Sequence, residues 1–216
     1  MGTAETKAEI IRTATMLFNE HGTRAVSTNH IAEKMGVSPG RIYYHFRNKE
    51  DIIREIYRQI IYFFNPVRKL PRDRTVNIND LRRLCGVLFT YMWEYRFFLR
   101  EAVPLMQRDP QLRKRLHDVR RRRLVQIRYF LQGLIKSGVM QEPEEEGTLD
   151  ELATISWLIT NAWPNFLMVD EKSLCRENVQ KGVELVLRVL KPYLTEQAWV
   201  ELSTPYDYPD PVRKVS

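Results

Sequence analysis

The chain has 216 residues, of which 44% are hydrophobic and 28% are charged, the balance of an ordinary globular protein. Its 9 glycines, 11 prolines and 2 cysteines exclude a collagen-like repeat, a disulfide scaffold and a four-cysteine zinc site. The formal net charge of +7 favours an anionic partner, nucleic acid first.

The N-terminal residues 3–9 are polar and show no secretory signal. With only Cys85 and Cys175 present, this predicts a reduced, cytoplasmic setting. The longest run without charge, Leu152 to Val169, approaches the length of a membrane-spanning helix. Because that run contains Pro164 and several Asn, Ser and Thr residues, it favours a buried or interface helix, and we expect no membrane partner.

Helical periodicity dominates from the N-terminus onward. The first helix has an apolar face and is expected to end at Gly22. Shorter helices are predicted at about residues 28–35 and 39–44. Asn48 then caps a long helix over residues 49–64. The inward residues of the first and last of these helices are Ile10, Ile11, Ala14, Leu17, Phe18, Ile52, Ile53, Ile56, Tyr57, Ile60 and Phe63.

A charged stretch with two prolines, residues 65–79, is expected to connect two parts of the chain. Asp109 followed by Pro110 predicts a clean helix start, with Asp as the cap and Pro at the first helical position. No strand-like alternation is visible, so the fold class is all-α. The further predicted helices cover residues 78–92, 96–106, 110–137, 149–167, 173–190 and 195–202.

The segment Ser27 to Phe46 has the spacing of a helix-turn-helix. Thr28 can cap its first helix, and Ala32 is small enough to let a second helix cross closely. Gly36 can adopt the left-handed conformation that turns the chain, and Ser38 can cap the next helix. In such a motif the second helix enters the major groove of DNA.

The second helix of this motif carries side chains suited to DNA. Arg41 can donate two hydrogen bonds to O6 and N7 of guanine. Tyr43, Tyr44 and His45 offer donors for phosphate oxygens, and Lys49 stands at a helix N-terminus, itself a phosphate site. From Arg41 to Lys49 the chain has three positive charges and no acid.

The string IYYHFRNKEDIIREI, together with the preceding helix, Gly22 and the turn, resembles the TetR family of bacterial one-component regulators. The resemblance covers roughly residues 7–60; beyond them only length and helical plan are similar. It implies a homodimer, a near-palindromic double-stranded operator, and an inducer pocket in a second domain. The DNA contacts that it implies are Thr28, Asn29, Ser38, Pro39, Gly40, Arg41, Tyr43, Tyr44, His45 and Lys49.

Two domains and a tail follow from this reading. A three-helix helix-turn-helix DNA-binding domain is expected over residues 5–64, with its motif at about 28–47. A larger helical ligand-binding and dimerisation domain is expected over 65–203, and a loose tail over 204–216. The four histidines lack metal-ligand spacing and no nucleotide-binding motif is present, so neither a metal nor a cofactor is expected.

A basic run extends from Arg113 to Arg123, with seven Lys or Arg residues and one acid. It is either a nucleic-acid-binding arm or a solvated helix face. Four consecutive arginines cannot share one helix face, so Arg120 or Arg123 is expected near the apolar stripe, as a salt bridge or as a partner for an acidic ligand. With the dense aromatics as an apolar lining, the candidate ligand-binding residues are Tyr91, Phe98, Arg120, Arg123, Phe130, Trp157 and Phe166.

The family resemblance also implies a dimer interface of four helices, two from each protomer. The helices starting near residues 149 and 173 correspond to that pair. The candidate interface residues on their apolar faces are Leu152, Ile155, Ile159, Trp163, Val179, Val183, Val186, Leu187 and Leu190.

The function predicted is a non-catalytic transcriptional repressor, released from its operator by a small, largely apolar ligand. The helix over residues 49–64 is the expected link between the two domains. A ligand-independent regulator or an activator with the same DNA-binding head stays open. Gly36 to Gly40 also matches the G-x-S-x-G nucleophile elbow, which would make Ser38 the nucleophile of an esterase, but that motif requires a preceding strand.

Overall fold

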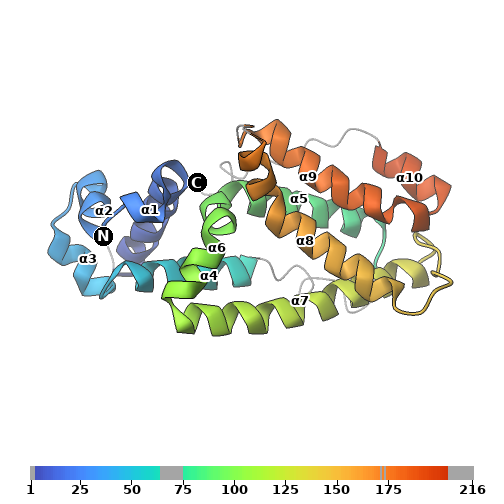
Figure 1. The fold of residues 1–216 in the computed structure, drawn as a ribbon, viewed down its shortest axis with the longest axis horizontal. Coiled ribbons are helices and arrows are strands. Elements are labelled where there is room, and N and C mark those ends of the chain that lie inside the picture. The colour runs from blue at the N-terminus through green and yellow to red at the C-terminus, as the bar shows by residue number, and fades with distance from the viewer. Residues whose placement is uncertain (1–2, 64–74, 171, 173, 204–216) are drawn as a thin grey trace. The chain divides into compact units, whose positions relative to one another are not determined.

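The computed structural model describes residues 3–63, 75–170, 172 and 174–203. Within these ranges every regular element is a helix, apart from one isolated bridge between Met140 and Leu194. The all-α prediction is confirmed; the predicted tail and most of the predicted connection lie outside the described residues. The elements (Figure 1) are α1 (Thr3–Ala25), α2 (Thr28–Met35), α3 (Pro39–His45), α4 (Lys49–Phe63), α5 (Ile78–Glu94), α6 (Arg96–Arg108), α7 (Pro110–Lys136), α8 (Thr148–Val169), α9 (Arg176–Leu190), the 3-10 turn η2 (Lys191–Tyr193) and α10 (Glu196–Ser203).

Several helix ends follow the predicted local signals. Gly22 has φ 76° and interrupts the regular helix near the end of α1. The Asn48 side-chain oxygen accepts a hydrogen bond from the backbone N–H of Asp51 at 2.9 Å and so caps α4. At the start of α7, Asp109 Oδ1 accepts from the backbone N–H of Gln111 and of Leu112, as its place before Pro110 predicts.

Tertiary contacts divide the chain into two compact units. Among the described residues, the first unit contains 3–63 together with 94–115, and the second contains 75–93 and the residues from 116 onward. The units therefore differ from a single division at residue 64, because α6 and the first turns of α7 pack with the N-terminal helices. The functions assigned to the two parts stay predictions.

Aromatic side chains from α6 complete the core of the first unit. Phe97 and Phe98 are both buried, and the Phe97 ring lies 5.2 Å from the ring of Phe18 on α1. The Phe98 ring stacks on Tyr57 of α4, with centroids 4.9 Å apart and planes 14° from parallel. Since α1 and α4 would otherwise expose these rings to water, α6 is part of the same hydrophobic core.

Close packing of α8 against α9 organises the second unit. A Cβ atom at Gly182 of α9 would collide with the side chains of Trp163 and Met92, so only glycine allows this approach. The Trp163 indole N–H donates to the backbone oxygen of Asn178 at 2.7 Å.

None of the described helices is long and apolar enough to cross a membrane. Cys85 and the partly exposed Cys175 are both free thiols.

Candidate nucleic-acid interface

Helices α2 and α3 form the predicted helix-turn-helix. Gly36 has φ 66° and ends α2, and the backbone N–H of Val37 donates to the oxygen of Ala32 at 3.0 Å. Ala32 and Ile42 are buried where the two helices pack against each other. The small side chain of Ala32 and the left-handed turn therefore set the crossing of α3 over α2.

The caps differ in detail from the prediction. Ser27, not Thr28, caps α2: its side chain accepts from the backbone N–H of His30, whose imidazole accepts in return from the N–H of Ser27. Ser38 stands at the N-cap position of α3, but its hydroxyl makes no capping hydrogen bond. Proline at the first position of α3 does not explain this, because Asp109 caps α7 in front of Pro110.

Thr28 is buried, and its hydroxyl lies 3.1 Å from the hydroxyl of Tyr43. This hydrogen bond joins the first turn of α2 to α3 and fixes the direction of the Tyr43 ring. Thr28 therefore positions Tyr43, which is itself predicted to contact DNA. Its own contact with DNA stays a prediction.

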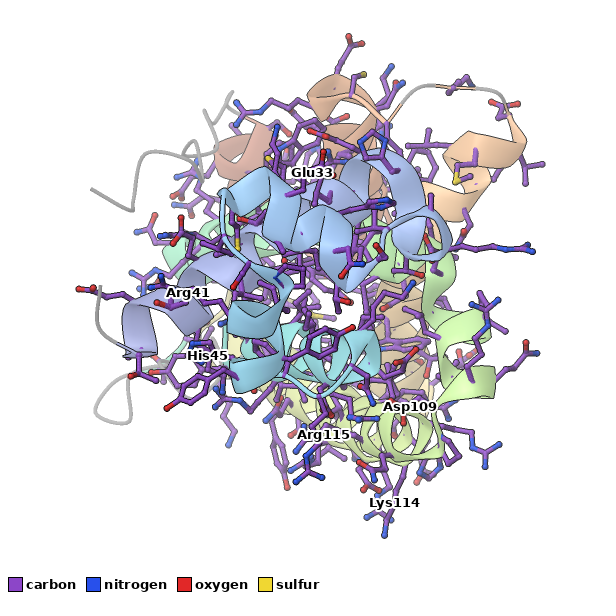
Figure 2. All side chains as sticks on the ribbon, turned by 90° about the vertical axis from the view of Figure 1, so that its left-hand side faces the viewer. Glu33, Arg41, His45, Asp109, Lys114 and Arg115 are labelled. Atoms are coloured by element: carbon purple, nitrogen blue, oxygen red, sulfur yellow. The ribbon has the colours of Figure 1, made fainter. Side chains whose placement is uncertain are left out.

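The outward surface of α3 is accessible along its length. Tyr44 is 77% exposed and Tyr43 is 52% exposed, far above the usual exposure of aromatic side chains. His45 is half-buried and meets Tyr44 edge to face. Figure 2 looks onto the end of the first unit that carries α3, with Arg41 and His45 labelled. The other predicted contact residues on this surface are also exposed: Asn29, Ser38, Pro39, Gly40 and Arg41.

Lys49 lies at the start of α4, where the sequence predicts a phosphate contact. Its ammonium group donates to the backbone oxygen of Thr23 at 2.6 Å and of Val26 at 2.8 Å. These oxygens belong to the segment that joins α1 to α2, so Lys49 holds that connection against α4. Two of its three N–H donors are used in this way, and one is left for a phosphate.

Polar contacts from α6 fix the end of α1. The Asn19 amide accepts from the backbone N–H of Phe97 at 3.0 Å and donates to the oxygen of Glu94 at 2.8 Å. Glu101 accepts from the backbone N–H of Thr23 at 3.1 Å and from the Thr23 hydroxyl. The Glu101 contact satisfies the N–H of Thr23 directly after Gly22, and the Asn19 contacts satisfy backbone groups where α5 meets α6.

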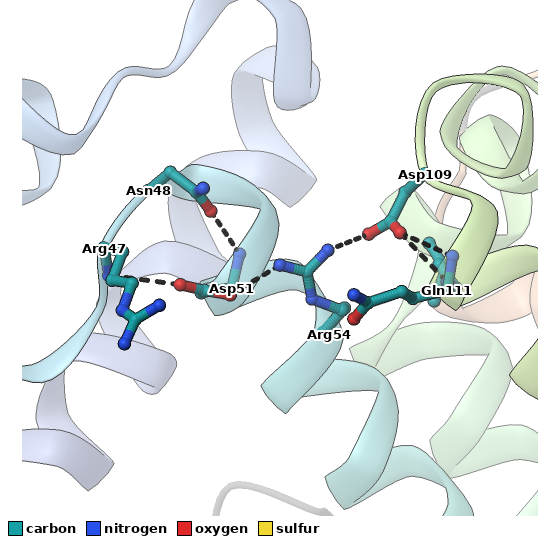
Figure 3. Close-up of polar contacts among 7 residues, drawn as sticks. Arg47, Asn48, Asp51, Arg54, Asp109 and Gln111 are labelled. Carbon is teal, nitrogen blue, oxygen red and sulfur yellow. Dashed lines mark hydrogen bonds and ion pairs between the residues drawn. The ribbon is translucent and has the colours of Figure 1, made fainter.

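A second polar chain joins α4 to the start of α7 (Figure 3). Arg54 donates to Asp51 at 2.5 Å and to Asp109 at 2.6 Å. Burial alone would lower the pKa of Arg54, but the hydrogen bonds and charges of the two carboxylates outweigh it and raise that pKa. Asp51 also accepts from the backbone N–H of Arg47, directly after α3. The first turns of α4 and α7 are therefore tied together within the first unit.

The second unit brings together some of the predicted ligand-binding residues. The guanidinium of Arg120, an exposed residue, lies 5.9 Å from the centre of the Trp157 ring, a cation–π contact. Tyr91 is buried and its hydroxyl donates to the Asn161 side-chain oxygen at 3.4 Å. Phe130 is buried, and Arg123 is half-buried and donates to Gln126.

Two residues of that predicted set lie elsewhere. Phe98 belongs to the first unit, where its ring stacks on Tyr57, so it does not join Tyr91 in one compact unit. Phe166 is 55% exposed and stacks on Trp163 at 5.2 Å, facing outward rather than into an interior. Aromatic character predicts that a ring is buried or contacts a partner, but it does not say against which element.

Most of the predicted dimer residues are buried inside their own protomer, and their role as contacts to a partner stays a prediction. The buried side chains pack α8 and α9 into the core of the second unit. Ile155 is 39% exposed, and Ile159 and Trp163 are half-buried. The buried ones are Leu152, Val179, Val183, Val186, Leu187 and Leu190.

Comparison with known proteins decides the family. Residues 49–201 match the TetR family described as "Bacterial transcriptional repressor", and residues 10–56 match "Bacterial regulatory proteins, tetR family". This chain belongs to the TetR family of bacterial transcriptional repressors. Its helix-turn-helix and its larger helical part both fall within the matched residues.

Individual TetR-family members resemble the chain to different extents. A TetR-family regulator from Marinobacter aquaeolei VT8 has a solved structure with 32% identity and a TM-score of 0.80, covering 91% of this chain and 93% of that one. The repressor KstR2 of Mycolicibacterium smegmatis is 25% identical over 67% of this chain and 68% of its own length. The regulator AcrR of Shigella flexneri is 40% identical, but over only 24% of this chain and 25% of its own length.

Membership of the TetR family also accounts for the G-x-S-x-G match. In a nucleophile elbow a strand must precede the serine, whereas Ser38 follows α2 and the left-handed turn at Gly36.

The residues that sequence reasoning missed are those on α6, above all Glu101 and its neighbours in the first unit. Their only local signal was that Glu101 is the single acidic residue of α6, a helix that also carries three arginines.

Proposed function

We propose that this chain represses transcription in the bacterial cytoplasm as a homodimer that binds a near-palindromic operator. In this proposal α3 enters the major groove, Arg41 reads a base edge, and Tyr43, Tyr44 and His45 contact phosphates. The main support for this proposal is the exposed outer surface of α3, which belongs to a helix-turn-helix in a TetR-family chain.

The dimer needs an exposed apolar surface, and α8 has one. Ile155, Leu158, Phe166 and Val169 lie at intervals of three, eight and three residues, which places them along one side of the helix. They are between 39% and 86% exposed, and Leu185 on the neighbouring α9 is 36% exposed. A continuous apolar patch of this kind on a soluble chain favours a contact with another protein surface. We therefore propose this surface for the two-fold contact; it includes Ile155 of the residues first predicted and leaves out the buried ones.

A small, largely apolar ligand is proposed to bind in the second unit, near Arg120, Trp157, Tyr91 and Phe130. The cation above the Trp157 ring supports a ligand that carries an acid, such as a fatty-acyl-like molecule. Helix α7 contributes residues to both units, which makes it a second route of communication beside α4. The ligand releases the operator if it binds more tightly to a state whose two α3 helices no longer match the half-sites.

Arg41→Ala is expected to reduce discrimination between operator base pairs by about 1–3 kcal/mol at the contacted position, because a bidentate contact with guanine is lost. Competition binding against duplexes with single base-pair changes measures this. Arg188→Ala, which removes an exposed arginine from α9, is the control for the change in net charge. If both variants keep the wild-type discrimination at every position, α3 is not the reading helix.

Ligand and operator must affect each other equally. We expect dodecanoate to bind about 5–150-fold more weakly when operator DNA is present, which corresponds to a coupling of about 1–3 kcal/mol. Tryptophan fluorescence, with and without the operator, follows the titration, and 1-dodecanol tests the need for the acid. Equal affinities in the two titrations would rule dodecanoate out as an inducer, however tightly it binds.

A further inference from the structure

A cluster of cations surrounds the junction of α6 and α7, away from α3. It consists of Arg108, Arg113, Lys114 and Arg115, and all four side chains are exposed. These residues belong to the first unit, the one that contains the helix-turn-helix. We call them the α7 basic cluster.

The charge of the α7 basic cluster is not neutralised by the described residues. None of its four side chains takes part in an ion pair within the part of the chain that the structure describes. The nearest acid in sequence, Asp109, is 7% exposed and is already used: one oxygen binds Arg54 and the other caps α7. The next acid, Asp118, lies 3.8 Å from His117. The cluster is thus a patch of free positive charge.

Polar contacts link the α7 basic cluster to the helix-turn-helix. Arg54 bridges Asp109 at the start of α7 to Asp51 in the first turn of α4, and Asp51 accepts from the N–H of Arg47, directly after α3 (Figure 3). In Figure 2, which views the first unit from the side that carries α3, the labelled side chains of Lys114 and Arg115 project outward and lie below Arg41 and His45 in that view. These contacts connect the start of α7 to the segment that follows α3 within one compact unit.

We propose that the α7 basic cluster forms a second set of phosphate contacts to the operator, in addition to those made around α3. Duplex DNA carries one negative charge for about every 1.7 Å of its axis, so a protein that seats α3 in a groove meets a continuous line of phosphates. The four unpaired cations on the same unit can bind these phosphates, and such contacts do not depend on the base sequence. This inference rests on the proposed DNA-binding function and assigns it residues outside the helix-turn-helix.

The test is the salt dependence of operator binding by the triple variant Arg113→Gln/Lys114→Gln/Arg115→Gln. Each lost phosphate contact is expected to reduce the slope of log affinity against log salt by about 0.9. The variant should bind more weakly than wild type at low salt, with the difference shrinking as salt rises. Discrimination between single base-pair variants of the operator should stay unchanged.

The matched control is Arg121→Gln/Arg122→Gln/Lys136→Gln, which removes two arginines and one lysine from exposed positions of α7 in the second unit. It should keep the wild-type slope. A second variant, Arg113→Lys/Arg115→Lys, keeps the charge and should keep the slope as well. If the glutamine variant at the cluster has the slope and affinity of wild type, the inference is wrong. If the wild-type protein selects no specific DNA at all, the proposed function fails instead, so the two failures are distinct.

Discussion

Leu158→Glu is expected to convert the dimer into monomers at micromolar protein concentration. Leu158 is 51% exposed in the middle of the apolar surface of α8, and a two-fold axis brings the substitution into the interface twice. Two carboxylates would lose water without gaining a partner. Because two linked reading heads bind a palindrome with an effective concentration that single heads lack, operator affinity should fall by about 10²–10⁴-fold.

Sedimentation of the variant and of its control measures this directly. Val125→Glu is a suitable control, since Val125 is an apolar residue of α7 with a similar exposure of 49%. It should remain dimeric and bind the operator normally. A dimeric Leu158→Glu protein, or a monomeric Val125→Glu protein, would move the interface away from α8.

Phe98→Ala is expected to lower the free energy of unfolding by about 3–5 kcal/mol. Phe98 is 1% exposed, and its ring covers the ring of Tyr57 in the core of the first unit. Truncation removes the transfer free energy of the ring and leaves a cavity between α4 and α6. The sequence suggested Phe98 as a ligand contact, and the structure places its ring in the core of the first unit.

Denaturant unfolding of three variants separates these roles. Phe98→Leu retains most of the side-chain volume and should lose less stability than Phe98→Ala. Tyr129→Ala, at a position 66% exposed on α7, should stay within about 0.5 kcal/mol of wild type. If Phe98→Ala unfolds like wild type but no longer binds dodecanoate, the original ligand assignment is right after all.

Local chemistry made the helix ends and the helix-turn-helix predictable. A left-handed glycine at Gly36 and an Asp–Pro pair at the start of α7 act within a few residues, so the sequence displays them directly. Lys49 shows the limit of this reasoning. A lysine at a helix start predicts an anion, but the carbonyl oxygens of Thr23 and Val26 come within reach only once the α1–α2 connection has folded.

Which side of α8 is left exposed could not be predicted from periodicity for a related reason. Helix α8 is apolar on more than one side, with Leu152 buried and Leu158 exposed. Hydrophobic spacing locates such sides but does not tell which one packs on α9 and which one is left for a partner. Likewise, the sequence shows that Phe97 and Phe98 avoid water, but only long-range contacts place them with the N-terminal helices.

The composition of the first unit has a consequence for synthesis on the ribosome. Translation delivers α1 to α4 first, yet the rings of Phe97 and Phe98 that cover Phe18 and Tyr57 emerge more than thirty residues after α4 ends. Until residue 115 has left the ribosome, α1 to α4 lack part of their core. They also lack Glu101, which binds Thr23, and Asp109, which binds Arg54. The nascent N-terminal segment is therefore not a complete DNA-binding domain. A chimaera of two relatives joined at residue 64 would separate α1 to α4 from the α6 residues that complete their core.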